Sequence, residues 1–208
     1  MPETRYVHGY SPRESERLDD QAQTLTELLH HDTHFPAGSR VLEAGCGIGA
    51  QTVILARNSP GARITAVDIS EDSLVRAQEK IHQERITNVV FRQANLFHIP
   101  FKPASFDHIF VCFVLEHLAD PSRVLALLRP LLKEGGTITV IEGDHGSAYF
   151  YPDSALARRS VQCLVDLQAQ AGGDSHSSGL SLWLSIMWLM KPGSAERYSR
   201  DLIGIKGK

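Results

Sequence analysis

A regular alternation of short β-rich runs with helical segments constrains the fold of this 208-residue sequence more than any other feature. The β-rich runs between residues 40 and 143 are RVLEA, RITAVDI, NVVFRQA, FDHIFVCFVL and GTITVIEG. Strands joined through helices make right-handed crossovers, which produce a parallel sheet. The sequence therefore predicts an α/β fold with a doubly wound, mostly parallel sheet and helices on both faces.

The first of these runs leads into a glycine-rich loop, VLEAGCGIGAQT. Gly45, Gly47 and Gly49 occupy alternate positions, and a loop of this kind lets a ligand approach the backbone closely. Gly45, Gly47 and Ala50 also fit the G-x-G-x-x-G/A pattern of dinucleotide-binding loops. The glycines thus leave two cofactor classes open.

Two carboxylates at strand ends narrow this choice. Glu43 lies two residues before Gly45, where its charge would repel a diphosphate but suit an ammonium or sulfonium group. Asp68 ends the second strand, where a carboxylate can accept hydrogen bonds from both ribose hydroxyls. Asp68 indicates a nucleoside ligand of either class, and Glu43 favours S-adenosylmethionine over a dinucleotide.

Several segments of the sequence resemble the motifs of the class I S-adenosylmethionine-dependent methyltransferases and follow one another in the same order as in that family. VLEAGCGIG is similar to that family's first motif. The segment Asn95–Pro121 is similar to its stretch after strand three, its fourth strand and the following turn. LLKEGGTITVIE looks like the turn into its fifth strand, with Glu134 replacing the usual proline. The resemblance covers about residues 38–145 and implies a Rossmann-like methyltransferase fold that binds S-adenosylmethionine.

The resemblance also implies cofactor contacts. The loop glycines would line the methionine moiety, and Ile69 would pack against the adenine. Asn95 stands where the family usually has aspartate and would face the adenine amino group, while the Leu96 N–H would face a ring nitrogen. Cys112 and Phe113 would form the floor near the methyl-donating end. The implied cofactor-binding residues are Tyr10, Glu43, Gly45, Gly47, Gly49, Asp68, Ile69, Asn95, Leu96, Cys112 and Phe113.

Two polar clusters after the fourth and fifth strands are candidates for the acceptor side. Glu116 and His117 form the first cluster, and Glu142, Asp144 and His145 form the second. His117 and His145 are the candidate catalytic residues, because imidazole titrates near neutral pH. Methyl transfer from a sulfonium mainly needs alignment, so no catalytic triad is expected, and Glu116 with His117 could instead only shape the turn.

The same features divide the chain into three segments. Residues 1–37 form a helical lead-in, in which a helix over 13–31 starts at a capping box and Tyr6 and Tyr10 precede it. Residues 38–173 form the cofactor-binding core, and residues 174–208 form a divergent C-terminal segment.

The C-terminal segment departs from the family pattern. LSLWLSIMWLM and RDLIGIK could supply strands six and seven as an antiparallel hairpin, or this end is altered. The second interpretation is slightly favoured, because the usual glycine-plus-aromatic entry into strand six is missing. An altered end would expose apolar surface around Trp183 and Trp188 and favour a homodimer.

Composition excludes several classes of function. A net charge of −3 with no basic stripe argues against nucleic acid. The polar N-terminus carries no apolar signal region and no apolar run is long enough to cross a bilayer, so we expect a cytoplasmic protein that does not bind membranes. The three scattered cysteines indicate neither disulfides nor zinc. The HHDTH sequence at residues 30–34 is interpreted as a solvated helix end rather than a metal site.

The leading hypothesis is a methyltransferase that moves a methyl group to a small-molecule acceptor by in-line displacement. One alternative is a non-catalytic module on the same fold that binds the cofactor or a partner. A less favoured alternative is an NAD(P)-dependent oxidoreductase.

Overall fold

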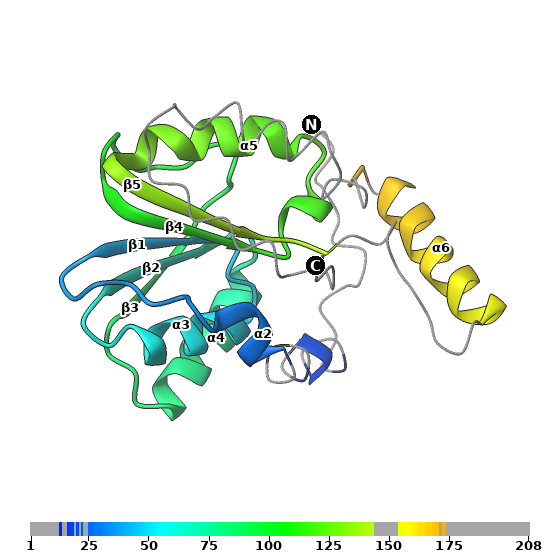
Figure 1. Ribbon diagram of the computed structural model, residues 1–208, viewed down its shortest axis with the longest axis horizontal. Coiled ribbons are helices and arrows are strands. Elements are labelled where there is room, and N and C mark those ends of the chain that lie inside the picture. Colours follow the sequence, from blue (N-terminus) through cyan, green and yellow to red (C-terminus); the bar gives the residue numbers. More distant parts are fainter. Residues whose placement is uncertain are drawn as a thin grey trace, which may run out of the picture.

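The computed structural model describes residues 25–143, 154–170 and 172–173, together with six positions between 13 and 22. In this part of the chain, five parallel strands form one sheet in the order β3-β2-β1-β4-β5 (Figure 1). The strands are β1 (Arg40–Ala44), β2 (Arg63–Asp68), β3 (Val89–Gln93), β4 (Phe106–Cys112) and β5 (Leu132–Ile141). The strand order reverses between β1 and β4, and this switch point is where ligands bind in open α/β sheets.

Helices cover both faces of the sheet. In Figure 1 α5 lies above the sheet, α2, α3 and α4 lie below it, and α6 extends to one side. The helices are α2 (Thr26–His30), α3 (Ala50–Asn58), α4 (Glu71–Gln83), α5 (Pro121–Leu128) and α6 (Ala155–Gln170), with short 3-10 helices η1 (Leu115–His117) and η2 (Arg129–Leu131). The predicted doubly wound α/β fold is confirmed, and the residues of the predicted C-terminal hairpin lie outside those described.

Alternate residues of the central strands supply the two cores. In β1, Val41 joins a buried cluster with Leu55 of α3, whereas the next residue, Leu42, joins a cluster with Val124 of α5. All four of these side chains are shielded from solvent. A strand buried on both faces carries a continuous apolar run, which explains sequences such as VL in β1 and IFV in β4.

Local sequence signals set several helix ends. The Ser70 hydroxyl accepts a hydrogen bond from the Ser73 N–H at the start of α4, which is a common N-cap arrangement for serine. The sequence PSRVLALLRPLLKE predicts a helix interrupted by Pro130; α5 ends at Leu128, and β5 begins at Leu132. Pro130 lies in the intervening 3-10 turn, where its missing N–H and its ring are incompatible with a continuing α-helix.

The N-terminal helix also differs from its prediction. The described positions between 13 and 22 are helical, but Leu25 is in a turn and α2 begins at Thr26. None of the described helices is long and apolar enough to cross a membrane.

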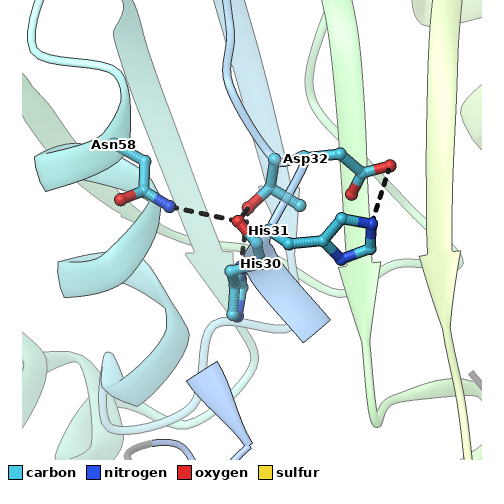
Figure 2. Close-up of polar contacts among 5 residues, drawn as sticks. His30, His31, Asp32 and Asn58 are labelled. Atoms are coloured by element: carbon cyan, nitrogen blue, oxygen red, sulfur yellow. Dashed lines mark hydrogen bonds and ion pairs between the residues drawn. The ribbon is translucent and has the colours of Figure 1, made fainter. Parts of the chain in front are cut away.

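The expectation of a solvated end at HHDTH is wrong for its first histidine. His30 is buried, with Nδ1 2.9 Å from Thr33 Oγ1 and Nε2 2.6 Å from Gln51 Oε1. Burial lowers the pKa of its imidazole. Figure 2 shows the Asn58 side chain reaching the His30 carbonyl oxygen, while exposed His31 faces Asp32. The His30 ring packs against the ring of Phe110 in β4, so α2 contacts the sheet through this buried histidine.

Candidate functional site

The glycine loop after β1 has a left-handed backbone at all three glycines. Their φ angles are +81° at Gly45, +50° at Gly47 and +79° at Gly49. The N–H groups of Gly45 and Cys46 donate to the Val67 carbonyl at 2.8 and 2.9 Å, which ties the loop to β2. Only glycine adopts this conformation without strain, so the residue type follows from the backbone path.

The three glycines face different surroundings. A Cβ at Gly45 would lie 2.6 Å from Val114 Cγ2, and one at Gly49 would lie 2.9 Å from Ala77 Cβ on α4. A Cβ at Gly47 would meet none of the described atoms within 4 Å. Packing therefore accounts for the first and third glycines, while the middle one leaves open space above the loop.

Asp68 connects the end of β2 to this loop. Its Oδ2 accepts a hydrogen bond from the Gly47 N–H at 2.8 Å, and its Oδ1 accepts one from the Ser70 N–H at 2.9 Å. Burial raises the pKa of Asp68, while these backbone donors act against the rise. Each carboxylate oxygen can still accept a further hydrogen bond. The neighbouring Ile69 is 57% exposed, which leaves an apolar side chain uncovered beside Asp68.

Glu43 is the most unusual group of the site. It is only 3% exposed, and its Oε2 has no hydrogen-bond partner among the described residues. Burial, with a contribution from the charge of Asp68, raises the pKa of Glu43 to about 8. The sequence prediction of a standing negative charge at Glu43 therefore needs correction: the carboxyl group is mostly protonated at neutral pH until a cation stabilises the charged form. A ligand ammonium or sulfonium fits this buried oxygen.

The end of β4 brings further predicted residues to the same edge. Cys112 is buried, and burial, together with the charges of Glu142, Glu43 and Glu116, raises the pKa of its thiol. Phe113 has a left-handed φ of +56° and donates its N–H to Ile141 O at 2.9 Å. The left-handed residue turns the chain sharply as it leaves the sheet.

Asn95 and Leu96 follow β3. The exposed Asn95 side chain accepts a hydrogen bond from the Phe97 N–H at 2.9 Å through Oδ1, and Leu96 is buried in the core. A carbonyl oxygen has two lone pairs, so Asn95 keeps one for another donor.

Glu142, which the sequence places in the second polar cluster, contacts the turn after β4. Glu142 Oε1 accepts hydrogen bonds from the N–H groups of Val114 at 3.0 Å and Leu115 at 2.9 Å. The sequence predicts the position of Glu142 after the fifth strand, but it does not indicate that Val114 and Leu115, in the turn after β4, are its hydrogen-bond partners.

Gln168 of α6 gave no sequence signal at all. It is fully buried, and its Nε2 donates to Glu116 Oε2 at 3.1 Å across 52 positions of sequence. Glu116 Oε1 in turn lies 3.6 Å from His117 Nε2. Packing of α6 against η1 thus joins two residues that the sequence placed far apart.

The described residues gather most of the predicted site at one edge of the sheet. Glu43, Asp68 and Cys112 act on each other electrostatically, and the glycine loop lies beside them. Tyr6, Tyr10 and His145 lie outside the described residues. Within the described ranges, no group of three His, Cys, Asp or Glu side chains could hold a metal ion.

The strand order, the left-handed glycine loop after β1 and the carboxylate at the end of β2 define a Rossmann-like nucleotide-binding fold. Residues 42–140 match the family model of the methyltransferase domain. This match and the fold support a methyltransferase domain of the class I S-adenosylmethionine-dependent type within residues 42–140.

Relatives and solved structures agree with this family. An uncharacterized protein of Synechococcus sp. is 37% identical over 65% of this chain and 31% of its own length. The 27-O-demethylrifamycin SV methyltransferase of Amycolatopsis mediterranei is 30% identical over 64% of this chain and 49% of its own length. The chain thus spans half or less of these two curated relatives.

A crystal structure of an S-adenosylmethionine-dependent methyltransferase from Aquifex aeolicus has the same fold. It superposes with a TM-score of 0.60 at 21% identity, covering 79% of this chain and 89% of that one.

Proposed function

We propose that this chain is an S-adenosylmethionine-dependent methyltransferase that acts on a small-molecule acceptor by in-line displacement. The observation that carries the proposal is Glu43, a buried carboxyl group directly before the glycine loop, whose Oε2 has no hydrogen-bond partner among the described residues. Burying such a group is unfavourable unless a ligand supplies a donor or a positive charge. A dinucleotide diphosphate would supply neither.

S-adenosylmethionine supplies a methyl group on a cationic sulfur and leaves as a neutral thioether. We assign binding of its amino-acid part to Glu43 and the loop around Gly47, where the open space lies. Asp68 accepts the ribose hydroxyls through its remaining lone pairs, and exposed Ile69 packs against the adenine. Asn95 accepts from the adenine amino group, while Leu96 offers its backbone N–H. The assigned residues lie at or just after the ends of β1, β2 and β3, which are neighbours in the sheet in this order.

The floor at the methyl-donating end is assigned to Cys112 and Phe113. The burial that raises the pKa of the Cys112 thiol also makes it unreactive, so its role is to shape the site. Tyr10 and His145 keep their predicted roles in covering the cofactor and serving the acceptor. His117, beside Glu116, remains a candidate for proton transfer.

A small acceptor is supported by the rifamycin methyltransferase relative, whose name indicates a small molecule methylated on oxygen. The net charge of −3 supports the exclusion of nucleic acid. A cytoplasmic location and a homodimer formed through residues 174–208 stay predictions.

A non-catalytic binding module is the second candidate. It is favoured by the departure of residues 174–208 from the family pattern, because the family often draws its substrate walls from this part of the chain.

Calorimetry with S-adenosylhomocysteine tests the cofactor assignment. We expect clear binding by the full chain, no binding of NAD, and roughly a 100-fold loss of affinity in Asp68→Ala, because two hydrogen bonds to a charged group contribute about 3 kcal/mol. Asp107→Ala is the matched control, since Asp107 also accepts a backbone N–H but lies at the opposite end of the sheet. NAD binding without S-adenosylhomocysteine binding would reject the assignment.

Transfer of tritiated methyl groups from S-adenosylmethionine into metabolite extracts separates the enzyme from the module. Labelled product supports the enzyme. Cofactor binding without any labelled product supports the module.

A further inference from the structure

Glu142 follows β5 directly, and its carboxylate is held in place by the turn after β4. Oε1 accepts two backbone hydrogen bonds, from Val114 at 3.0 Å and from Leu115 at 2.9 Å. The same turn contains left-handed Phe113, and its Val114 side chain covers the face of Gly45. Glu142 therefore fixes the segment that closes the glycine loop on the β4 side.

The second carboxylate oxygen of Glu142 has a different environment. Oε2 is buried and has no hydrogen-bond partner in the described ranges. Because Oε1 is fixed by two donors, Oε2 has a defined position as well. A buried oxygen without a donor is costly, so a ligand that brings a proton to this point would be stabilised.

The strand order places Glu142 on the far side of β4 from Glu43 and Asp68. Glu43 and Asp68 end the neighbouring strands β1 and β2, whereas Glu142 follows β5, and β4 lies between these two groups. The Cys112 thiol at the end of β4 is influenced by Glu142, Glu43 and Glu116 together. A cofactor held at β1 and β2 would direct its methyl group toward β4, and Glu142 lies beyond it.

We propose that Glu142 is a further catalytic residue, whose Oε2 takes the proton from an N–H or O–H nucleophile of the methyl acceptor. This inference rests on the proposed function. The acceptor nitrogen or oxygen forms its bond to the methyl carbon as the carbon–sulfur bond breaks, and that electron pair stays on sulfur. The acceptor's proton passes to Glu142 Oε2 and then to solvent, so the net products are methylated acceptor, S-adenosylhomocysteine and one proton.

The protonation equilibrium of Glu142 suits this role. Burial, with a contribution from the charge of Glu116, raises its pKa to about 7, while the backbone N–H groups of Leu115, Val114 and Glu116 oppose the rise. A proton acceptor works best when its pKa lies near the working pH. The titratable groups around it are Glu116, Cys112 and Glu43, with His117 beside Glu116.

The charges around Glu142 also restrict the acceptor. Three carboxyl groups act on the end of β4, and the one described imidazole beside them is His117. When these carboxyl groups are ionised, anionic acceptors such as phosphates and carboxylates are disfavoured by like charge. A neutral alcohol or phenol, or an amine, is the class that fits.

The test uses Glu142→Gln with Glu43→Gln as its matched control. Glutamine at position 142 keeps an oxygen that can accept the two backbone hydrogen bonds but cannot take a proton. We expect Glu142→Gln to bind S-adenosylhomocysteine within about threefold of the wild type and to transfer methyl groups at least roughly 100-fold more slowly. Glu43→Gln should instead lose S-adenosylhomocysteine affinity. Wild-type transfer rates in Glu142→Gln, or an affinity loss equal to that of Glu43→Gln, would overturn the inference.

Infrared spectroscopy provides a readout that needs no acceptor. In the S-adenosylhomocysteine complex, the difference spectrum between wild type and Glu142→Gln should contain a protonated carboxyl band that disappears as pH rises through neutrality. A band already absent at the lowest pH at which the protein stays folded would contradict a proton-accepting role. Failure of S-adenosylhomocysteine to bind the wild type would reject the proposed function, whereas a titrating band in the free protein would still support Glu142.

Discussion

The acidic residues at the two ends of the strands of the sheet lie in opposite electrostatic environments. At the amino end, Asp107 of β4 receives the Lys133 ammonium at 2.7 Å and the Arg40 N–H at 2.8 Å, and these donors hold its pKa below its usual range. At the carboxyl end, Glu43 and Glu142 are buried and their pKa values are raised to about 8 and about 7. The acid at the amino end is paired within the chain, whereas Oε2 of Glu43 and Oε2 of Glu142 have no hydrogen-bond partner among the described residues.

The glycines differ in the same way. Gly135 at the amino end of β5 has a φ of +75° and open space where a Cβ would be, so only its backbone conformation requires glycine. Gly45 at the carboxyl end has a φ of +81° and also a neighbour, Val114, within 2.6 Å of the missing Cβ. The carboxyl end thus combines strained backbone, close packing and unsatisfied acids, which is typical of a binding site maintained at the expense of stability.

The largest expected effect comes from exchanging these glycines for alanine. Gly45→Ala should lower the free energy of unfolding by about 4 kcal/mol, because left-handed strain and a clash with Val114 add. Gly135→Ala should lower it by about 1 kcal/mol, from strain alone. Urea unfolding monitored by circular dichroism measures both, and equal losses would show that packing above the loop is unimportant.

A smaller effect is expected from the charge of Glu43 in the free protein. Its pKa is higher in the folded state than in the unfolded chain, so folding takes up a proton and stability falls as pH rises toward about 8. Between about pH 6 and pH 8 the wild type should lose roughly 2 kcal/mol more than Glu43→Gln, given about 1.4 kcal/mol per pKa unit. Thermal unfolding across this range measures the difference, and parallel curves for the two proteins would exclude a buried, titrating Glu43.

The smallest effect is expected at the amino end. Lys133→Met removes the ion pair with Asp107, whose side chain is 31% exposed, and should lower stability by about 0.5 kcal/mol at neutral pH. Because the pKa of Asp107 is lowered in the folded state, the stability it contributes is present above its unfolded pKa and disappears as pH falls through the folded value. The variant should therefore converge with the wild type in acid; a constant difference would point to lost packing instead.

Much of the fold could be predicted because local signals and hydrophobic patterns agree. The Ser70 cap, the buried run of β4 and the glycine loop each specify their structure within a few residues of sequence. The end of α5 and the start of β5 were misplaced, since apolar Leu131 and Leu132 fit either a helix face or a buried strand.

The site was less predictable where it depends on distant contacts. Asp68 and Glu43 follow strand ends and could be found from that position alone. The protonation of Glu43 could not, because it results from burial under α3 and the loop. Gln168 is 52 positions from Glu116, and the burial of His30 depends on Gln51 and Phe110. The spacing of residues in the sequence does not indicate such contacts.

The most direct test of the role of Glu43 as a partner of a cationic ligand is the number of protons released when the cofactor binds. S-adenosylhomocysteine binding would be measured by calorimetry at about pH 7 in buffers of different ionisation enthalpy, for the wild type and Glu43→Gln. At this pH Glu43 is mostly protonated, and the ligand ammonium favours its charged form, so we predict release of about one proton per molecule bound and much less in the variant. Binding without proton release, or equal release by both proteins, would contradict the assignment of Glu43 as the partner of the cofactor's positive charge.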